Sequence, residues 1–127
     1  PESEQAKDAA KLLAELNDKM AQKEMINADL YYNLGTYMGN NYLSAVITAE
    51  NALKKYPATK HREDLMIIIL KSKYQQALYS EPGLKIERYQ ATVDEYYTYM
   101  NEFPQGKFVK EATQIFRDSE RNLPKTD

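Results

Sequence analysis

Apolar residues recur along much of this chain at intervals of three and four, the spacing that places side chains on one face of an α-helix. The first segment shows it clearly, with apolar residues at Ala6, Ala9, Ala10, Leu13, Leu16 and Met20. The pattern predicts six helices, over residues 4–23, 27–38, 42–55, 61–79, 84–101 and 108–123. Because no segment alternates apolar and polar residues as a half-buried strand does, we expect an all-α fold.

Glycine and proline mark the boundaries between these segments. The chain has only four Gly and five Pro, and apart from Pro1 they lie at Gly35, Gly39, Pro57, Pro82, Gly83, Pro104, Gly106 and Pro124. The residue before a proline disfavours helical backbone angles, so Tyr56-Pro57 and Phe103-Pro104 each predict the end of a helix.

An internal repeat relates the two aromatic-Pro turns. A shift of 47 residues places Tyr56-Pro57 on Phe103-Pro104 and brings further pairs into register: Tyr42 with Tyr89, Val46 with Val93, Leu53 with Met100, Asp64 with Glu111, and Ile68 with Ile115. A shift of 35 places Asp29-Leu30 on Asp64-Leu65. The difference of twelve residues indicates an extension of the second helical hairpin near its loop.

A period in the mid-thirties built from two helices is typical of tetratricopeptide (TPR) arrays. Tyr32-Asn33-Leu34-Gly35 resembles the first-helix signature of the TPR family, and Ala45, Ala49, Ala52 and Pro57 resemble its second-helix small residues and terminal proline. The stretch from Gly35 to Ala45 is shorter than the family's spacing. The alternative is an irregular helical bundle in which the internal repeat arises by chance.

The resemblance implies a single TPR-like domain over residues 1–127, an α-solenoid of antiparallel helical hairpins. Its parts are a leading helix (1–24), a repeat (25–60), an extended repeat (61–107) and a final helix (108–123).

Composition narrows the classes of partner. The 127 residues include 17 basic and 19 acidic side chains, so the net charge of -2 argues against nucleic acid. The longest apolar run, residues 65–70, is too short to span a bilayer, and we expect a soluble chain. The absence of Cys excludes disulfides and thiolate metal sites.

The sequence predicts neither a catalytic centre nor a cofactor. The single histidine, His61, lies between Lys60 and Arg62, which favours a solvated surface position. Adjacent carboxylates such as Asp94-Glu95 point to different sides of a helix. Glycines are too few for a phosphate-binding loop. We therefore expect a non-catalytic protein that binds other proteins.

In a TPR stack the first helix of each hairpin lines a groove. With Gly35 as the reference, the two repeat shifts predict nine groove residues: Asp29, Tyr32, Thr36, Asp64, Ile67, Lys71, Glu111, Gln114 and Asp118. Tyr32 and Ile67 fit packing between helices equally well. The side chains of Tyr96, Tyr97 and Tyr99 point in three directions around one helix, so at least one must face outward.

A more specific resemblance is to the BamD family of TPR lipoproteins in the outer-membrane β-barrel assembly machinery. It rests on Ala28-Asp29-Leu30-Tyr31-Tyr32, Asn41-Tyr42-Leu43-Ser44-Ala45-Val46, Tyr56-Pro57-Ala58-Thr59 and Arg62-Glu63-Asp64-Leu65. The stretches Gly39-Asn40-Asn41-Tyr42 and Asn101-Glu102-Phe103-Pro104 look most like the Bacteroidetes branch. The similarity covers about residues 24–115.

The resemblance implies a scaffold at the periplasmic face of the outer membrane. Its partners would be the barrel-forming assembly subunit and unfolded outer-membrane proteins. This chain would be the C-terminal part of the protein, without the N-terminal lipid anchor and the first repeats. Two alternatives stay open: a general TPR adaptor that binds short peptides, and a helical domain that serves a catalytic chain.

Overall fold

The computed structural model describes residues 3–125 of the chain, and throughout this range the regular structure is helical. It contains the five helices α1 (Glu4–Leu34), α2 (Asn41–Lys55), α3 (Arg62–Leu78), α4 (Pro82–Glu102) and α5 (Val109–Arg121). The all-α fold is thereby confirmed. The expectation of six helices is not met, because the first two predicted helices form one.

The continuous helix α1 replaces the break expected between residues 23 and 27. No glycine or proline lies between Glu4 and Leu34, and the residues near the expected break form helix readily. The helix ends instead at Gly35, whose φ of 57° suits glycine and whose N–H donates to the Tyr31 carbonyl. The expected helical continuation to Met38 is therefore a turn.

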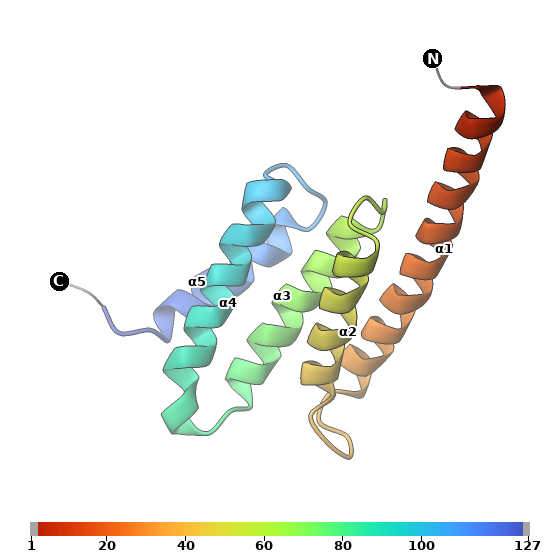
Figure 1. Ribbon diagram of the computed structural model, residues 1–127. Coiled ribbons are helices and arrows are strands. Elements are labelled where there is room, and N and C mark those ends of the chain that lie inside the picture. Colours follow the sequence, from red (N-terminus) through yellow and green to blue (C-terminus); the bar gives the residue numbers. More distant parts are fainter. Residues whose placement is uncertain (1–2, 126–127) are drawn as a thin grey trace.

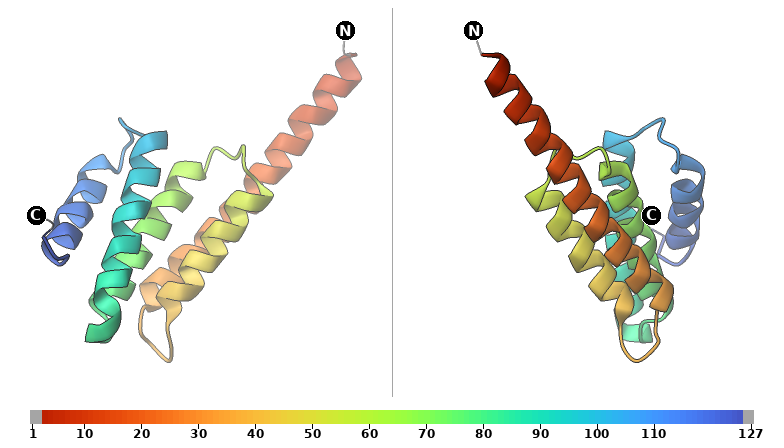
Figure 2. Two further views of the ribbon diagram at one scale, coloured as in Figure 1. Left: turned by 60° about the vertical axis from the view of Figure 1, so that its left-hand side comes forward. Right: turned by 90° about the vertical axis from the view of Figure 1, so that its right-hand side faces the viewer.

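The helices form two layers (Figure 1). Each helix packs against the next in sequence, and α3 also contacts both α1 and α5. The layer of α1, α3 and α5 is thus covered by α2 and α4. Helix α1 extends well past the other helices at its N-terminal end, as the views in Figure 2 also show. The result is a row of two antiparallel hairpins followed by a final helix.

Helix α3 lies at the centre and joins two hydrophobic clusters. All six residues of its apolar run, from Leu65 to Leu70, are buried. Leu65, Ile68 and Ile69 pack into one cluster with α1 and α2, whereas Met66, Ile67 and Leu70 pack into another with α4 and α5. A helix that is apolar around its circumference is stable only when neighbours cover both sides, which is the position of α3.

Small side chains bring α1 and α2 close together. Ala21 and Ala28 of α1 are fully buried, as are Ala45 and Ala49 of α2. Because alanine lacks bulk beyond Cβ, neighbouring helix backbones can approach closely at these positions. The predicted small-residue set of residues 45–52 therefore does pack between helices.

The two aromatic-Pro turns share one backbone geometry. Tyr56 and Phe103 both end a helix with φ of -128°, and their N–H groups donate to carbonyls four residues earlier at 2.8 Å in each case. Further along, Thr59 and Gly106 donate to the carbonyls of Tyr56 and Phe103 at 3.1 and 3.0 Å. The shift of 47 residues therefore relates two turns with the same hydrogen bonds.

Each of these turns is hydrogen-bonded to a carboxylate. The carboxylate belongs to the preceding helix of the α1–α3–α5 layer. Asp18 of α1 accepts from the Thr59 hydroxyl at 2.8 Å and from the Lys60 N–H at 3.1 Å. Hydrogen bonds to the charged form lower the pKa of Asp18. At the second turn, Glu63 of α3 accepts from the Lys107 N–H at 2.8 Å. Both N–H groups lie outside helices, so side chains satisfy them.

Tyr99 completes the second turn. Its buried hydroxyl donates to Glu63 at 2.7 Å and accepts from the Phe108 N–H at 3.1 Å. Burial, reinforced by the hydrogen bond to Glu63, raises the pKa of Tyr99 to about 12. Tyr97, in contrast, is 54% exposed, so the expectation that one member of this tyrosine set faces outward is confirmed.

We expect Gly106→Ala to destabilise the protein by about 1–3 kcal/mol, because overpacking forces neighbours out of position. A Cβ at Gly106 would lie 2.7 Å from the Tyr99 hydroxyl and 2.9 Å from the Phe103 Cβ, and it would contact Glu63. Urea unfolding followed by circular dichroism measures the loss. Gly83→Ala is the matched control, since no atom lies within 4 Å of its added Cβ, and it should leave stability equal or higher.

The raised pKa of Tyr99 predicts a loss of stability at alkaline pH. The neutral phenol is favoured in the folded state, so its contribution is complete below the ordinary tyrosine pKa of about 10. It is lost as the pH rises from there through about 12. Free energies of unfolding measured across this window should decline less steeply in Tyr99→Phe. The same change at exposed Tyr97 should preserve the original slope, and equal slopes in all three proteins would contradict the assignment.

Candidate functional site

A hollow of about 310 Å³ lies where α1, α3 and α5 meet. Its lining consists of Met25, Ile26 and Asp29 from α1, Asp64, Ile67, Ile68 and Lys71 from α3, and Phe108 and Glu111 at the start of α5. We call it the α1–α3–α5 hollow. Five side chains in this lining are apolar and four are charged. It can therefore accept an apolar group while offering charges around it.

The hollow gathers five of the nine predicted groove residues: Asp29, Asp64, Ile67, Lys71 and Glu111. These residues are separated by up to 82 positions in sequence, and the two repeat shifts were what predicted their common face. That they bind a partner stays a prediction. Ile67 is only 3% exposed and belongs to the core cluster, so packing is its main role.

Lys71 links the hollow to Tyr32. Its ammonium lies 4.4 Å from the centroid of the Tyr32 ring and 3.9 Å from Asp29 Oδ1. The position over the ring is a cation–π contact. Tyr32 is itself half-buried against the cluster of α1, α2 and α3. It therefore packs between helices and also lies beside the predicted groove. Its ring packs in the core while one face holds Lys71.

The charges around the hollow are only partly balanced. Asp64 lies 3.0 Å from the ammonium of Lys107, and Asp29 has the loose pairing with Lys71. Within residues 3–125, no ion pair of 4.0 Å or less includes Glu111. Burial chiefly raises the pKa of Tyr32, and the negative charges of Glu111 and Asp29 add to this effect. The hollow therefore has a negative side at Glu111.

Asp118 serves as a structural anchor between α3 and α5. It accepts a hydrogen bond of 2.6 Å from the Tyr74 hydroxyl and pairs with Arg121 at 3.2 Å. Burial, followed by the bond to Asp118, raises the pKa of Tyr74 to about 12. Although Asp118 was predicted as a groove residue, its carboxylate is occupied by these two neighbours.

Besides Tyr32 and Asp118, two further predicted groove residues do not line the hollow. Gln114 is exposed on α5 and does not contribute to the lining. Thr36 follows the end of α1 and lines a different hollow, with Tyr42, Tyr79 and Arg88 among its neighbours. The early end of α1 at Leu34 explains the displacement of Thr36, because the prediction had placed it within a helix.

The apolar floor includes residues that the sequence did not single out. Met25 and Ile26 were assigned to a break between helices, and Phe108 to the start of the last helix. In the structure Met25 and Ile26 lie within α1, where residues three and four apart share a face with Asp29. A prediction of one continuous helix would have placed Met25 and Ile26 beside the predicted groove.

A second candidate surface is the outer face of α1. Its large apolar residues Leu12, Leu13 and Leu16 are 66%, 58% and 55% exposed. Met20, Leu30 and Leu34 are exposed as well. Leu30 and Leu34 each follow Leu12 and Leu16 by 18 residues, about five full turns, so they continue the same side. We call these six residues the α1 face.

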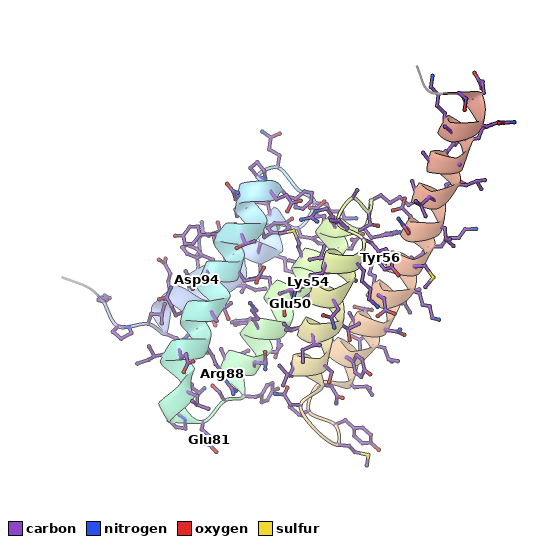
Figure 3. The ribbon with its side chains drawn as sticks, in the orientation of Figure 1. Glu50, Lys54, Tyr56, Glu81, Arg88 and Asp94 are labelled. Carbon is purple, nitrogen blue, oxygen red and sulfur yellow. The ribbon has the colours of Figure 1, made fainter. Side chains whose placement is uncertain are left out.

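The apolar residues of the first predicted helix contribute to this exposed face. The first segment was predicted to be an amphipathic helix with Ala6, Ala9, Ala10, Leu13, Leu16 and Met20 at helical spacing, and in the structure all six residues are exposed. All of residues 3–16 are exposed, and the N-terminal part of α1 extends past the other helices (Figure 1). In contrast, the face formed by α2 and α4 carries charges of both signs, including Glu50, Lys54, Arg88 and Asp94 (Figure 3).

His61 lies before α3, and its backbone N–H donates to the Thr59 hydroxyl at 3.2 Å. Among residues 3–125 there is no cluster of three or more His, Cys, Asp or Glu side chains that could hold a metal ion. In the same range, every helix is too short or too polar to cross a bilayer.

The fold defines the class of this protein as an all-helical chain of paired antiparallel helices. Comparison with known proteins adds no family to that description. No protein-family model matches the sequence, and no curated protein matches it.

The hollow yields a test that separates its core and surface residues. Ile67→Ala should lower stability by about 2–5 kcal/mol, because it leaves a cavity in the core. Lys71→Ala should cost roughly 1 kcal/mol or less, since a loose ion pair with the exposed Asp29 and a single cation–π contact contribute little. Thermal unfolding of both variants provides the comparison. An equal loss in the two proteins would show that Lys71 also supports the core.

Proposed function

We propose that this protein is a non-catalytic scaffold of the TPR type that binds protein partners. The α1 face carries the proposal. Six large apolar side chains lie exposed along one side of a helix that extends past the rest of the fold. Leu12, Leu13, Leu16 and Met20 are close together on this side, and exposed apolar surface of this kind marks sites of protein interaction. Covering a leucine side chain contributes about 1.5–3 kcal/mol, so a partner helix along this face would gain a large apolar interface.

The TPR assignment is supported by the arrangement of the helices. Two antiparallel hairpins lie in a row, and the turns that follow them have matching hydrogen bonds at a shift of 47 residues. A row of hairpins in which each helix packs on its neighbours is the architecture of α-solenoids. The alternative of an irregular bundle does not account for the repeated turn geometry.

The particular role that we propose is in the outer-membrane β-barrel assembly machinery. The support is the sequence resemblance to the BamD family at residues 28–32, 41–46, 56–59 and 62–65. These stretches lie in the packed region of α1, α2 and α3 and in the turn between α2 and α3. The partner would then be the barrel-forming subunit at the periplasmic face of the outer membrane.

A general TPR adaptor for short peptides is the second candidate. It is favoured by the α1–α3–α5 hollow, whose apolar floor and charged surroundings suit a peptide side chain. The full-length gene distinguishes the two: an N-terminal signal ending in a lipidated cysteine supports the assembly machinery, and a bare cytosolic start supports the adaptor.

We expect the double variant Leu13→Gln with Leu16→Gln to lose its partner while keeping its helical content. Both side chains are more than half exposed, so the protein alone loses little buried apolar area. Loss of two buried leucines in a complex corresponds to about 100-fold or more in affinity. The measurement is recovery of the barrel-forming subunit, identified by mass spectrometry, from the envelope fraction of the native organism with the tagged protein.

Lys11→Gln with Glu15→Gln is the matched control, because both residues lie on the other side of α1. It should retain the partner. Undiminished recovery with the leucine variant would remove the α1 face from the proposal. Failure of the unaltered protein to recover the barrel-forming subunit would reject the role in barrel assembly.

A further inference from the structure

We propose that the α1–α3–α5 hollow binds a peptide segment in which an apolar side chain is adjacent to an arginine or lysine. The apolar side chain enters the hollow, and the cationic group lies against Glu111. The inference deepens the proposed scaffold function and rests on it, but it concerns a surface distinct from the α1 face. It names the chemistry of a segment that the scaffold recognises.

The size of the hollow suits a single side chain of a bound peptide. Pockets for cofactors and drug-sized ligands span roughly 300–1,000 Å³, and this one, at about 310 Å³, is at the lower limit. Its apolar surface comes from the partly covered Met25 and Phe108, the exposed Ile26, and the buried Ile67 and Ile68. An apolar side chain that displaces water from such a surface is stabilised by the area it covers.

The charges around the hollow favour a cationic residue next to the apolar residue in the bound peptide. Three carboxylates line the hollow, at Asp29, Asp64 and Glu111, against the single ammonium of Lys71. Lys107, at the edge, balances Asp64 at 3.0 Å, and Lys71 is shared between Asp29 and the Tyr32 ring. Glu111, exposed on the first turn of α5, is left as the carboxylate that an incoming cation can pair with.

A larger hollow elsewhere in the described residues has the opposite charge, and this difference makes the acidic hollow selective for a basic segment. It measures about 1020 Å³ and lies between α4 and the C-terminal segment, with Arg117, Arg121 and Lys125 against Glu120. A basic peptide is repelled there and attracted to Glu111, since charge complementarity decides between competing surfaces more than it adds affinity. The choice of a basic partner thus follows from the two surfaces together.

The test uses the full chain and two fluorescein-labelled peptides, measured by fluorescence anisotropy. The first peptide is Gly-Ser-Gly-Leu-Arg-Leu-Gly-Ser-Gly, and the second replaces its arginine by glutamine. The arginine peptide should bind about two- to fivefold more tightly, as expected for one solvent-exposed ion pair. The difference should shrink at high salt, because screening weakens exposed charge pairs.

Glu111→Gln should weaken binding of the arginine peptide by about two- to fivefold and leave binding of the glutamine peptide unchanged. The matched control is Glu87→Gln, an exposed glutamate on α4, which should change neither. Equal binding of the two peptides, no response to Glu111→Gln, or no saturable binding of the arginine peptide would overturn the inference.

The two proposals fail separately. If the peptide does not bind but the barrel-forming subunit is still recovered through the α1 face, the scaffold function is supported. Only the proposal that this hollow binds a peptide is then rejected. If the peptide binds as described but the subunit is not recovered, the hollow stands as the site of a peptide adaptor.

Discussion

The fold depends on the burial of helix α3 from both sides. Its six consecutive apolar residues, from Leu65 to Leu70, contribute to two separate clusters, and no single neighbour could cover them all. The hairpin partner α4 covers one side, while α1 and α2 cover the other. Because α5 also packs on α3, this one helix fixes the α1–α3–α5 layer and thereby brings Asp29, Lys71 and Glu111 to one hollow.

The turns control how the hairpins follow one another. Asp18 and Glu63, each from the preceding helix of that layer, accept backbone N–H groups at equivalent places in the two turns. Such bonds satisfy donors that would otherwise lack a partner and hold the next helix at a set angle. Around Gly106 the arrangement leaves no room for a side chain, so packing and hydrogen bonding together define the second turn.

The two candidate surfaces differ in their physical character. The α1 face is an extended apolar strip suited to a helix or another large partner, and the α1–α3–α5 hollow is a small, charged recess suited to one side chain. A scaffold can use both at once, because they lie on different sides of α1. The extended surface would provide most of the affinity, while the hollow would provide discrimination between partners.

The sequence by itself determined the helical class, the aromatic-Pro turns and the shift that relates them, since these depend on local periodicity and on proline's restriction of its neighbour. The repeat shifts also predicted five residues of the hollow. The continuity of α1 agrees with the sequence, since neither glycine nor proline interrupts residues 4–34 and the residues near the expected break form helix readily. The end of α1 at Leu34, before the expected end at Met38, became clear only in the structure. Only tertiary packing decided that Leu13 and Leu16 lie exposed, since an apolar stripe shows that a helix has a face to cover and not which neighbour covers it.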